Sequence, residues 1–164
     1  MADTTPTTQQ HITAQQVKGK KLDYTYAIGR RRESVARVRL YEHVKDGLMW
    51  NELAINKGDV LVNEKPITDF FTAEVMRHMY AEPFRVTNTV NKYTLTVKVT
   101  GGGRMGQLKA VILGISNALA LVDEEKYRGV LKEKGFLTRD ARIRERRKVG
   151  TGGKARRKKQ SPKR

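Results

Sequence analysis

The sequence predicts a small α+β domain in which helices cover one face of a β-sheet. Three observations support this fold class. Apolar and polar residues alternate in several short segments, as they do in half-buried strands. Later segments repeat their apolar residues every three to four positions, as helices do. The strand-like and helix-like segments are mixed along the chain, beginning with two strands that fit a hairpin.

The first two strands are predicted at 24–28 and 34–41. The polar segment "GRRRE" (29–33) lies between them and predicts a hairpin turn. Residues 34–41 place Ala36, Val38 and Leu40 on one face, and the other face carries Val35, Arg37, Arg39 and Tyr41. One face of this hairpin is therefore expected to be buried.

The middle of the chain is less regular. Residues 42–53 contain "DG", which favours a turn, and 54–67 predicts one or two short strands. A helix is predicted at 68–80, with Thr68 as its N-cap and Pro83 ending it.

The clearest strand is predicted at 91–100 and is followed by the glycine-rich turn "GGGRMG" (101–106). Residues 107–122 then form one apolar stripe at helical spacing. A second helix is predicted at 123–135, with acidic residues at its start and Gly135 at its end.

Composition limits the function classes. The 164 residues fit one domain with tails, and 34 Lys plus Arg against 17 Asp plus Glu give a net charge of +17. A charge of that size favours a polyanionic partner. The absence of cysteine excludes disulfides and thiolate metal sites. No apolar run approaches the roughly 20 residues of a membrane helix, and no signal peptide is evident, so a cytosolic protein is expected.

The charge is unevenly distributed and predicts three regions. Residues 1–23 are polar, carry a net charge of +1 and are expected to be a disordered extension. Residues 24–135 carry +5 and predict the globular domain. Residues 136–164 carry +11 with few apolar side chains, and predict an extended basic tail.

Arginine dominates the start of this tail. The segment "LTRDARIRERRKVG" (137–150) has five arginines in nine residues, and an Asp140–Arg144 pair allows partial helicity. A guanidinium binds phosphate at two points and stacks on bases, whereas a membrane-surface helix needs a larger apolar face. Likewise, Arg37 and Arg39 on one strand face repel each other unless an anion neutralises them. Both features favour nucleic acid.

The glycines of 101–106 also match the G-x-G-x-x-G pattern of dinucleotide-binding proteins, with Asp123 at the expected distance. The context differs, because Asp123 ends a helix rather than a strand. The turn still allows backbone N–H groups and Arg104 to approach a phosphate, and a plain strand-to-helix turn is the alternative.

No catalytic constellation or metal-ligand spacing is evident. The three histidines are scattered, and Trp50 is expected to pack at a hairpin. A small nucleotide-binding enzyme is a rival from another class, but no acid or base can be assigned to it. No cofactor is expected.

Several of these segments together resemble the family of small-subunit ribosomal protein nine in its bacterial form. The resemblance covers about 24–164 and includes "GRRRESVARVRLY", "INKGDVLVNEKPITDFF", "YTLTVKVTGGGRMGQLKAVILGISNALAL", "LKEKGFLTRDARIRERRKVGTGGKARRK" and the terminal "KR". It implies a mixed four-stranded sheet with helices on one face, like the second domain of small-subunit ribosomal protein five, and a long basic C-terminal extension.

The resemblance also implies the function. It implies a structural constituent of the small-subunit head in a cytoplasmic, bacterial-type ribosome, and not an enzyme. The implied partners are 16S-type rRNA, neighbouring head proteins and the anticodon stem-loop of the P-site tRNA, with neither membrane nor DNA. A non-ribosomal architectural nucleic-acid-binding protein is the alternative.

The predicted site residues follow from the basic clusters and the resemblance together. The terminal pair, Lys163 and Arg164, is assigned to the P-site tRNA. The residues assigned to rRNA are Arg30, Arg31, Arg32, Arg37, Arg39, Gly101, Gly102, Gly103, Arg104, Arg139, Arg142, Arg144, Arg146, Arg147, Lys148, Lys154, Arg156, Arg157, Lys158 and Lys159.

Two features depart from the family pattern. The chain ends in "QSPKR", without the aromatic residue that usually precedes Ser-Lys-Arg. The segment "EHVKDGLMWNEL" is longer than the usual loop, and 1–23 also exceeds the common N-terminus.

Overall fold

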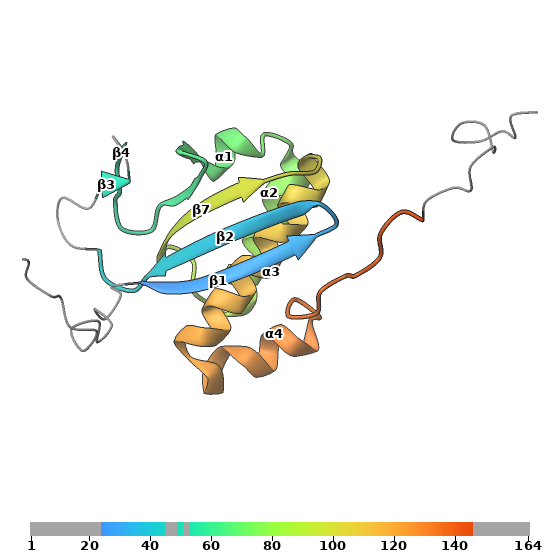
Figure 1. Cartoon of the computed structure of the whole chain (residues 1–164). Coiled ribbons are helices and arrows are strands. Elements are labelled where there is room, and N and C mark those ends of the chain that lie inside the picture. The colour runs from blue at the N-terminus through green and yellow to red at the C-terminus, as the bar shows by residue number, and fades with distance from the viewer. Residues whose placement is uncertain (1–23, 45–48, 51–52, 146–164) are drawn as a thin grey trace, which may run out of the picture.

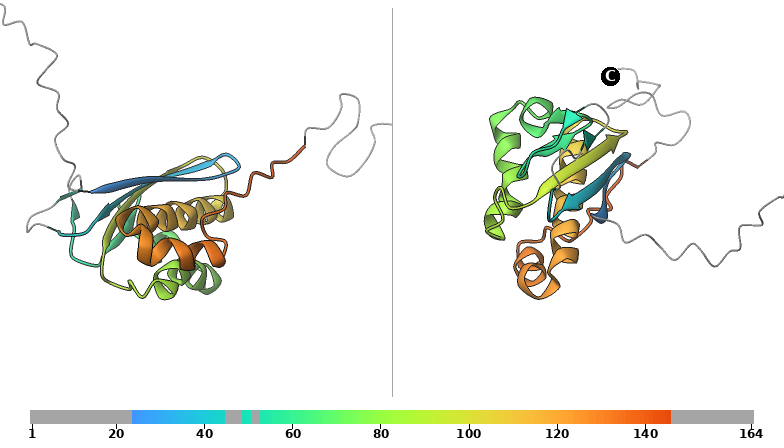
Figure 2. Two further views of the ribbon diagram at one scale, coloured as in Figure 1. Left: turned by 90° about the horizontal axis from the view of Figure 1, so that it is seen from below. Right: turned by 90° about the vertical axis from the view of Figure 1, so that its left-hand side faces the viewer.

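The computed structural model describes residues 24–44, 49–50 and 53–145 of the chain. These residues form an α+β domain in which helices lie against one face of a mixed sheet (Figures 1 and 2). The predicted fold class is confirmed. The predicted N-terminal extension and the tail from 146 onward lie outside the described residues.

The main sheet has five strands in the order β1-β2-β7-β5-β6. Only β5 and β7 pair in parallel, and the other neighbours are antiparallel. Four strands were expected, and the additional one is the two-residue edge strand β6. The separate β3–β4 pair lies in the irregular segment. The strands are β1 Thr25–Arg31, β2 Ser34–Tyr41, β3 Met49–Trp50, β4 Leu53–Ala54, β5 Val60–Val62, β6 Lys65–Pro66 and β7 Thr94–Thr100.

The helices cover one sheet face (Figure 2). The opposite face of β1, β2 and β7 carries exposed charged side chains. The helical segments are α1 Ile67–Phe70, α2 Glu74–Val86, α3 Arg104–Val122, the π-helix η2 Glu124–Arg128 and α4 Gly129–Glu133.

The predicted helix at 68–80 is wrong in its limits. It divides into α1 and α2, because Phe71 leaves the helical conformation and packs into the core with 1% of its surface exposed. Pro83 lies inside α2 rather than ending it. Its ring and that of Phe84 are buried, and this burial offsets the backbone hydrogen bond that proline cannot donate.

The core forms where α3 crosses β1 and β2. Leu108, Val111 and Ile115 of α3 are fully buried in this layer. At Gly29 the backbone of β1 lies so close to α3 that a side chain would overlap the carbonyl oxygen of Ala110. Only glycine permits this approach.

Helix α3 also corrects an expectation about membranes. By length and composition alone it could cross a membrane, and it is the only such helix in the part of the chain that the structure describes. The expectation that no apolar run is long enough was therefore too strict. The helix packs on the sheet, and its place in the core accounts for its apolar composition.

Candidate nucleic-acid interface

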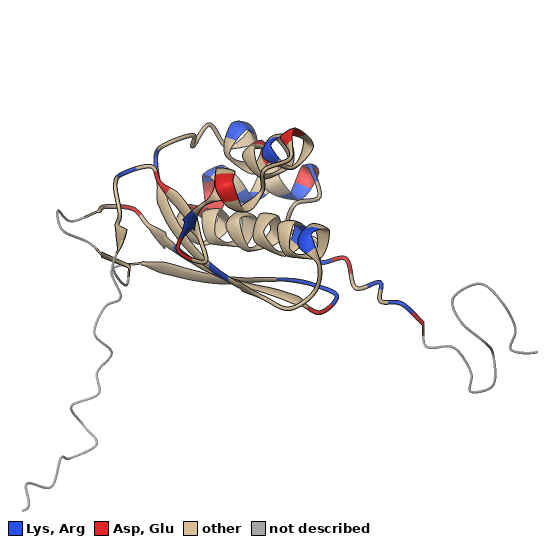
Figure 3. Ribbon diagram, turned by 90° about the horizontal axis from the view of Figure 1, so that it is seen from above, with Lys and Arg blue, Asp and Glu red and all other residues tan. Residues whose placement is uncertain are grey.

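Three segments far apart in the sequence meet at one end of the domain. They are the turn between β1 and β2, the glycine turn at 101–103 and the segment 138–145 (Figure 3). The Ser34 hydroxyl at the start of β2 donates to the Gly101 carbonyl at 3.1 Å, which joins the two turns. We call this region the basic end, after its exposed arginines: Arg30, Arg32, Arg104, Arg139, Arg142 and Arg144.

The glycine turn needs its glycines. Gly101 and Gly102 have φ angles of +73° and +66°, a region that side chains rarely adopt. A Cβ on Gly102 would also overlap the Ser34 hydroxyl. Gly103 then precedes α3 in an extended conformation, and its carbonyl accepts the Gln107 N–H at 2.9 Å. The exposed start of α3 and its Arg104 side chain therefore form an electropositive surface.

Arg31 attaches the start of the tail to the sheet. Unlike its neighbours it is buried, with 8% of its surface exposed. Its guanidinium lies 2.9 Å from the Asp140 carboxylate and donates to the Arg142 carbonyl at 2.6 Å. We call these contacts the Arg31 anchor. The rRNA contact predicted for Arg31 stays a prediction, but its guanidinium already has protein partners.

Asp140 is shared between two arginines. Its carboxylate accepts the Arg142 backbone N–H at 3.0 Å and two side-chain N–H groups of Arg142 at 3.0 and 2.9 Å. The predicted Asp140–Arg144 helical pair is wrong, because residues 138–145 are not helical and the carboxylate turns to Arg142 and Arg31 instead.

These contacts predict how Asp140 titrates. Hydrogen bonds from Arg142, followed by the charges of Arg142 and Arg31, hold the pKa of the Asp140 carboxyl well below its ordinary value near 3.9. Because the folded pKa is lowered, the stabilisation is complete above the unfolded value and is lost only as pH falls through the folded pKa. NMR of the Asp140 carboxyl carbon should therefore show a midpoint well below 3.9. The Arg142→Gln variant should titrate closer to 3.9, and a normal midpoint in the intact protein would contradict the ion pair.

Arg37 and Arg39 lie away from the basic end, on the open face of the sheet. In the strand register Arg37 is opposite Lys98 of β7, and Arg39 is opposite Thr96. Lys98 was not among the predicted site residues. Its position in the alternation of 91–100, opposite the buried apolar side chains, was the sequence signal that could have identified it.

The remaining predicted site residues lie outside the described part of the chain. They belong to the tail and are Arg146, Arg147, Lys148, Lys154, Arg156, Arg157, Lys158, Lys159, Lys163 and Arg164.

The alternative chemistries find no support in the geometry. Asp123 accepts the Lys126 N–H at 3.1 Å and pairs with the Lys126 ammonium at 2.7 Å, so it caps η2. A dinucleotide fold would place this carboxylate at the end of a second strand instead. The described residues contain no group of three His, Asp or Glu arranged to hold a metal ion.

The comparisons with known proteins point to one family. The family model described as Ribosomal protein S9/S16 matches residues 29–164, which include the basic end and the whole tail. The chain belongs to this family. It is therefore a structural protein of the small ribosomal subunit and not an enzyme, as predicted.

Curated members of the S9 family show the extent of the similarity. The chain is 42% identical over 131 residues to small ribosomal subunit protein uS9 of Maridesulfovibrio salexigens, covering 80% of this chain and 90% of that protein. It is 40% identical over 124 residues to uS9 of Leifsonia xyli subsp. xyli, covering 76% of this chain and 66% of the relative.

Proposed function

We propose that the protein binds 16S-type rRNA in the head of the small subunit through its basic end, and that its tail reaches the P-site tRNA. The observation that carries this proposal is the meeting of two arginine-bearing segments with the glycine turn beside Arg104, at the point where the tail begins. The fold thus gathers arginines that are spread over more than 100 positions of the sequence.

The chemistry of the basic end suits a phosphate backbone. Its arginines are exposed, and a guanidinium can donate two parallel hydrogen bonds to one phosphate. The carboxylate of Asp140 is already occupied by Arg31 and Arg142, so Glu33 and Glu145 are the acidic groups left among the arginines. With arginines in excess, contacts to phosphate rather than to bases are expected to dominate.

The tail supplies the second part of the proposal. Residues 146–164 contain ten basic and no acidic side chains. The 15 residues from 150 to 164 span roughly 50 Å if extended, at about 3.3 Å per residue. A chain of this length and charge can enter an RNA cavity that excludes a folded domain, and it gains affinity by releasing counterions. The terminal Lys163 and Arg164 are then the groups assigned to the tRNA.

The remaining partners follow from family membership. We place the protein beside neighbouring head proteins in a cytoplasmic, bacterial-type ribosome, without membrane or DNA. The alternative of a non-ribosomal architectural protein loses its basis, because the family match extends over the tail as well as the domain.

Binding to rRNA should depend steeply on salt. We expect affinity for a small-subunit head rRNA fragment to fall by about 10³-fold between 50 and 200 mM salt, as for a protein that makes six or more phosphate contacts. Filter binding over a salt series measures the slope. A slope near zero would contradict a phosphate-based interface and, with it, the proposed function.

The end of the tail should act on tRNA rather than on assembly. Deleting Lys163 and Arg164 should leave subunit assembly intact and weaken P-site tRNA binding about tenfold, because two charge contacts are lost. The control replaces Lys158 and Lys159 with glutamine, which removes the same charge further from the end. Equal tRNA affinity in truncated and intact subunits would contradict the terminal role.

A further inference from the structure

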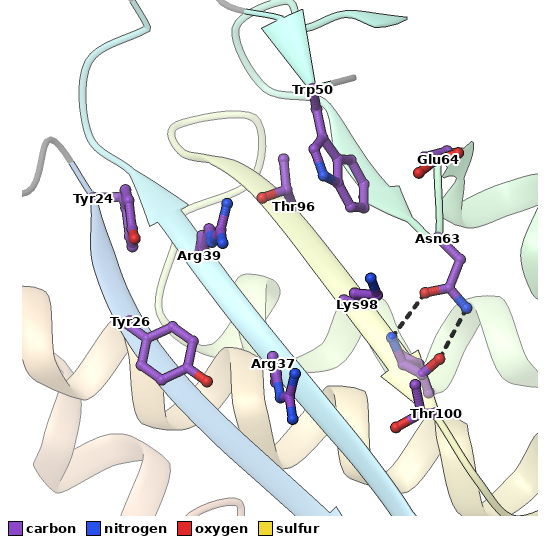
Figure 4. Close-up of a pocket in the computed structure, with 11 residues that line it drawn as sticks. Tyr24, Tyr26, Arg37, Arg39, Trp50, Asn63, Glu64, Thr96, Lys98 and Thr100 are labelled. Atoms are coloured by element: carbon purple, nitrogen blue, oxygen red, sulfur yellow. Dashed lines mark hydrogen bonds between the residues drawn. The ribbon is translucent and has the colours of Figure 1, made fainter. Parts of the chain in front are cut away.

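A groove with a volume of about 910 Å³ lies on the open face of the sheet, where basic and aromatic side chains face each other (Figure 4). We propose that this groove holds an unpaired nucleotide of single-stranded RNA, which stacks on Trp50 while Arg37, Arg39 and Lys98 contact its phosphates. The proposal rests on the proposed function and adds a second RNA contact, separate from the basic end.

The floor of the groove carries positive charge. Arg37 of β2 and Lys98 of β7 are register partners, and both are exposed. Like charges directly opposite each other destabilise a sheet. Within the described residues neither side chain has an ion pair with a carboxylate, so a bound anion would remove this repulsion.

The walls of the groove are aromatic. Figure 4 shows Trp50 on one side and Tyr24 and Tyr26 on the other, with the two arginines between them. Tyr26 is 42% exposed, and the Arg39 guanidinium lies 5.2 Å from the centre of the Tyr24 ring. Basic residues that follow a nucleic-acid backbone beside rings that stack on bases are typical of single-strand binding sites.

The rim of the groove carries an amide that is already hydrogen-bonded and a single carboxylate. Asn63 accepts the Val99 backbone N–H at 2.8 Å and donates to the Val99 carbonyl at 3.0 Å, so its amide is engaged by β7 (Figure 4). Glu64 is the single carboxylate among the lining residues, against three cations. The groove therefore has a net positive charge, and its flat rings fit a nucleobase better than an acidic peptide.

Trp50 gives a direct test, because it is the only tryptophan in the chain. A short unstructured oligouridylate titrated into the full-length protein should quench Trp50 fluorescence to saturation, whereas an RNA duplex of equal charge should quench it much less. Labelled oligouridylate should bind Trp50→Leu and Arg37→Gln about tenfold more weakly in fluorescence anisotropy, since the first variant loses base stacking and the second loses a phosphate contact.

The matched control is Arg85→Gln, which removes one exposed arginine from α2 on the helical side of the sheet. It should bind oligouridylate like the unmodified protein. Thermal melting checks that each variant is folded. If Trp50→Leu does not fold, Arg37→Gln still tests the proposal.

Three results would contradict the proposed nucleotide site. The first is equal oligouridylate affinity in Trp50→Leu and the unmodified protein, and the second is an equal loss of affinity in Arg37→Gln and Arg85→Gln. The third is quenching of Trp50 fluorescence by polyglutamate that is as strong as quenching by oligouridylate. If the head rRNA fragment still binds with its salt dependence in such a case, the proposed function stands and only the groove is lost. Failure of the unmodified protein to bind that fragment would contradict both the proposed function and the nucleotide site in the groove.

Discussion

Replacing Gly29 with alanine is expected to destabilise the domain by about 3 kcal/mol and to lower its melting temperature by about 10 °C or more. The added methyl group would overlap the Ala110 carbonyl oxygen and crowd the Gly114 N–H. Both are backbone atoms of α3, so no side chain can rotate away to make room. The helix must move off β1, and the core between them must open. Chemical denaturation and thermal melting measure the loss.

The same substitution at Gly129 provides the control. Gly129 has helical φ and ψ angles of −56° and −54°, and a Cβ there would meet no atom within 4 Å. Alanine is the better helix former, so Gly129→Ala should stabilise the protein by about 0.5–1 kcal/mol. If the same glycine-to-alanine change lowers stability at position 29 and raises it at position 129, the effect at Gly29 comes from the contact with α3. A neutral Gly29→Ala variant would contradict the packing described here.

Replacing Arg31 with glutamine should release the start of the tail while the domain stays folded. The Arg31 anchor joins the sheet to Asp140 and Arg142, and a shorter neutral side chain cannot reach either partner. We expect trypsin to cut after Arg139 and Arg142 about tenfold faster in this variant, because the segment opens more often once the charged hydrogen bond that holds it is lost. Mass spectrometry of the digest identifies the two cuts.

Arg30→Gln is the control for this experiment. Arg30 is the preceding residue, but it is exposed and belongs to the basic end rather than to the anchor. Its replacement should weaken rRNA binding and leave cleavage after Arg139 and Arg142 unchanged. If Arg30→Gln and Arg31→Gln accelerate cleavage equally, the anchor is not what protects this segment.

The sequence predicted most of the sheet and the core helix, because these elements carry regular apolar periods. The alternation of apolar and polar residues predicted β2 with its observed limits, and the apolar stripe predicted α3 except for its first turn. The prediction failed at 68–80, where Phe71 and Pro83 have roles that only tertiary packing decides. Local propensity favoured one continuous helix, and burial of Phe71 divided it.

The candidate site was predictable as a set of residue types but not as an arrangement. Charge density alone identified Arg30 to Arg32 as one cluster. The strand alternation exposes Arg30 and buries Arg31, Arg32 is exposed in the turn, and Asp140 lies 109 positions from Arg31. No periodic signal connects such distant partners. The same limit applies to the groove, since the pairing of Arg37 with Lys98 depends on strand register.

The Arg31 anchor has a consequence for assembly. Because residues 140–142 are held against the sheet, the chain after them continues from a fixed point. If the domain docks on rRNA as we propose, entry of residues 146–164 into the RNA becomes an intramolecular step, at an effective concentration of the order of millimolar. A tail released from its anchor would search a larger volume and enter the RNA more slowly, with the same charge and the same final contacts.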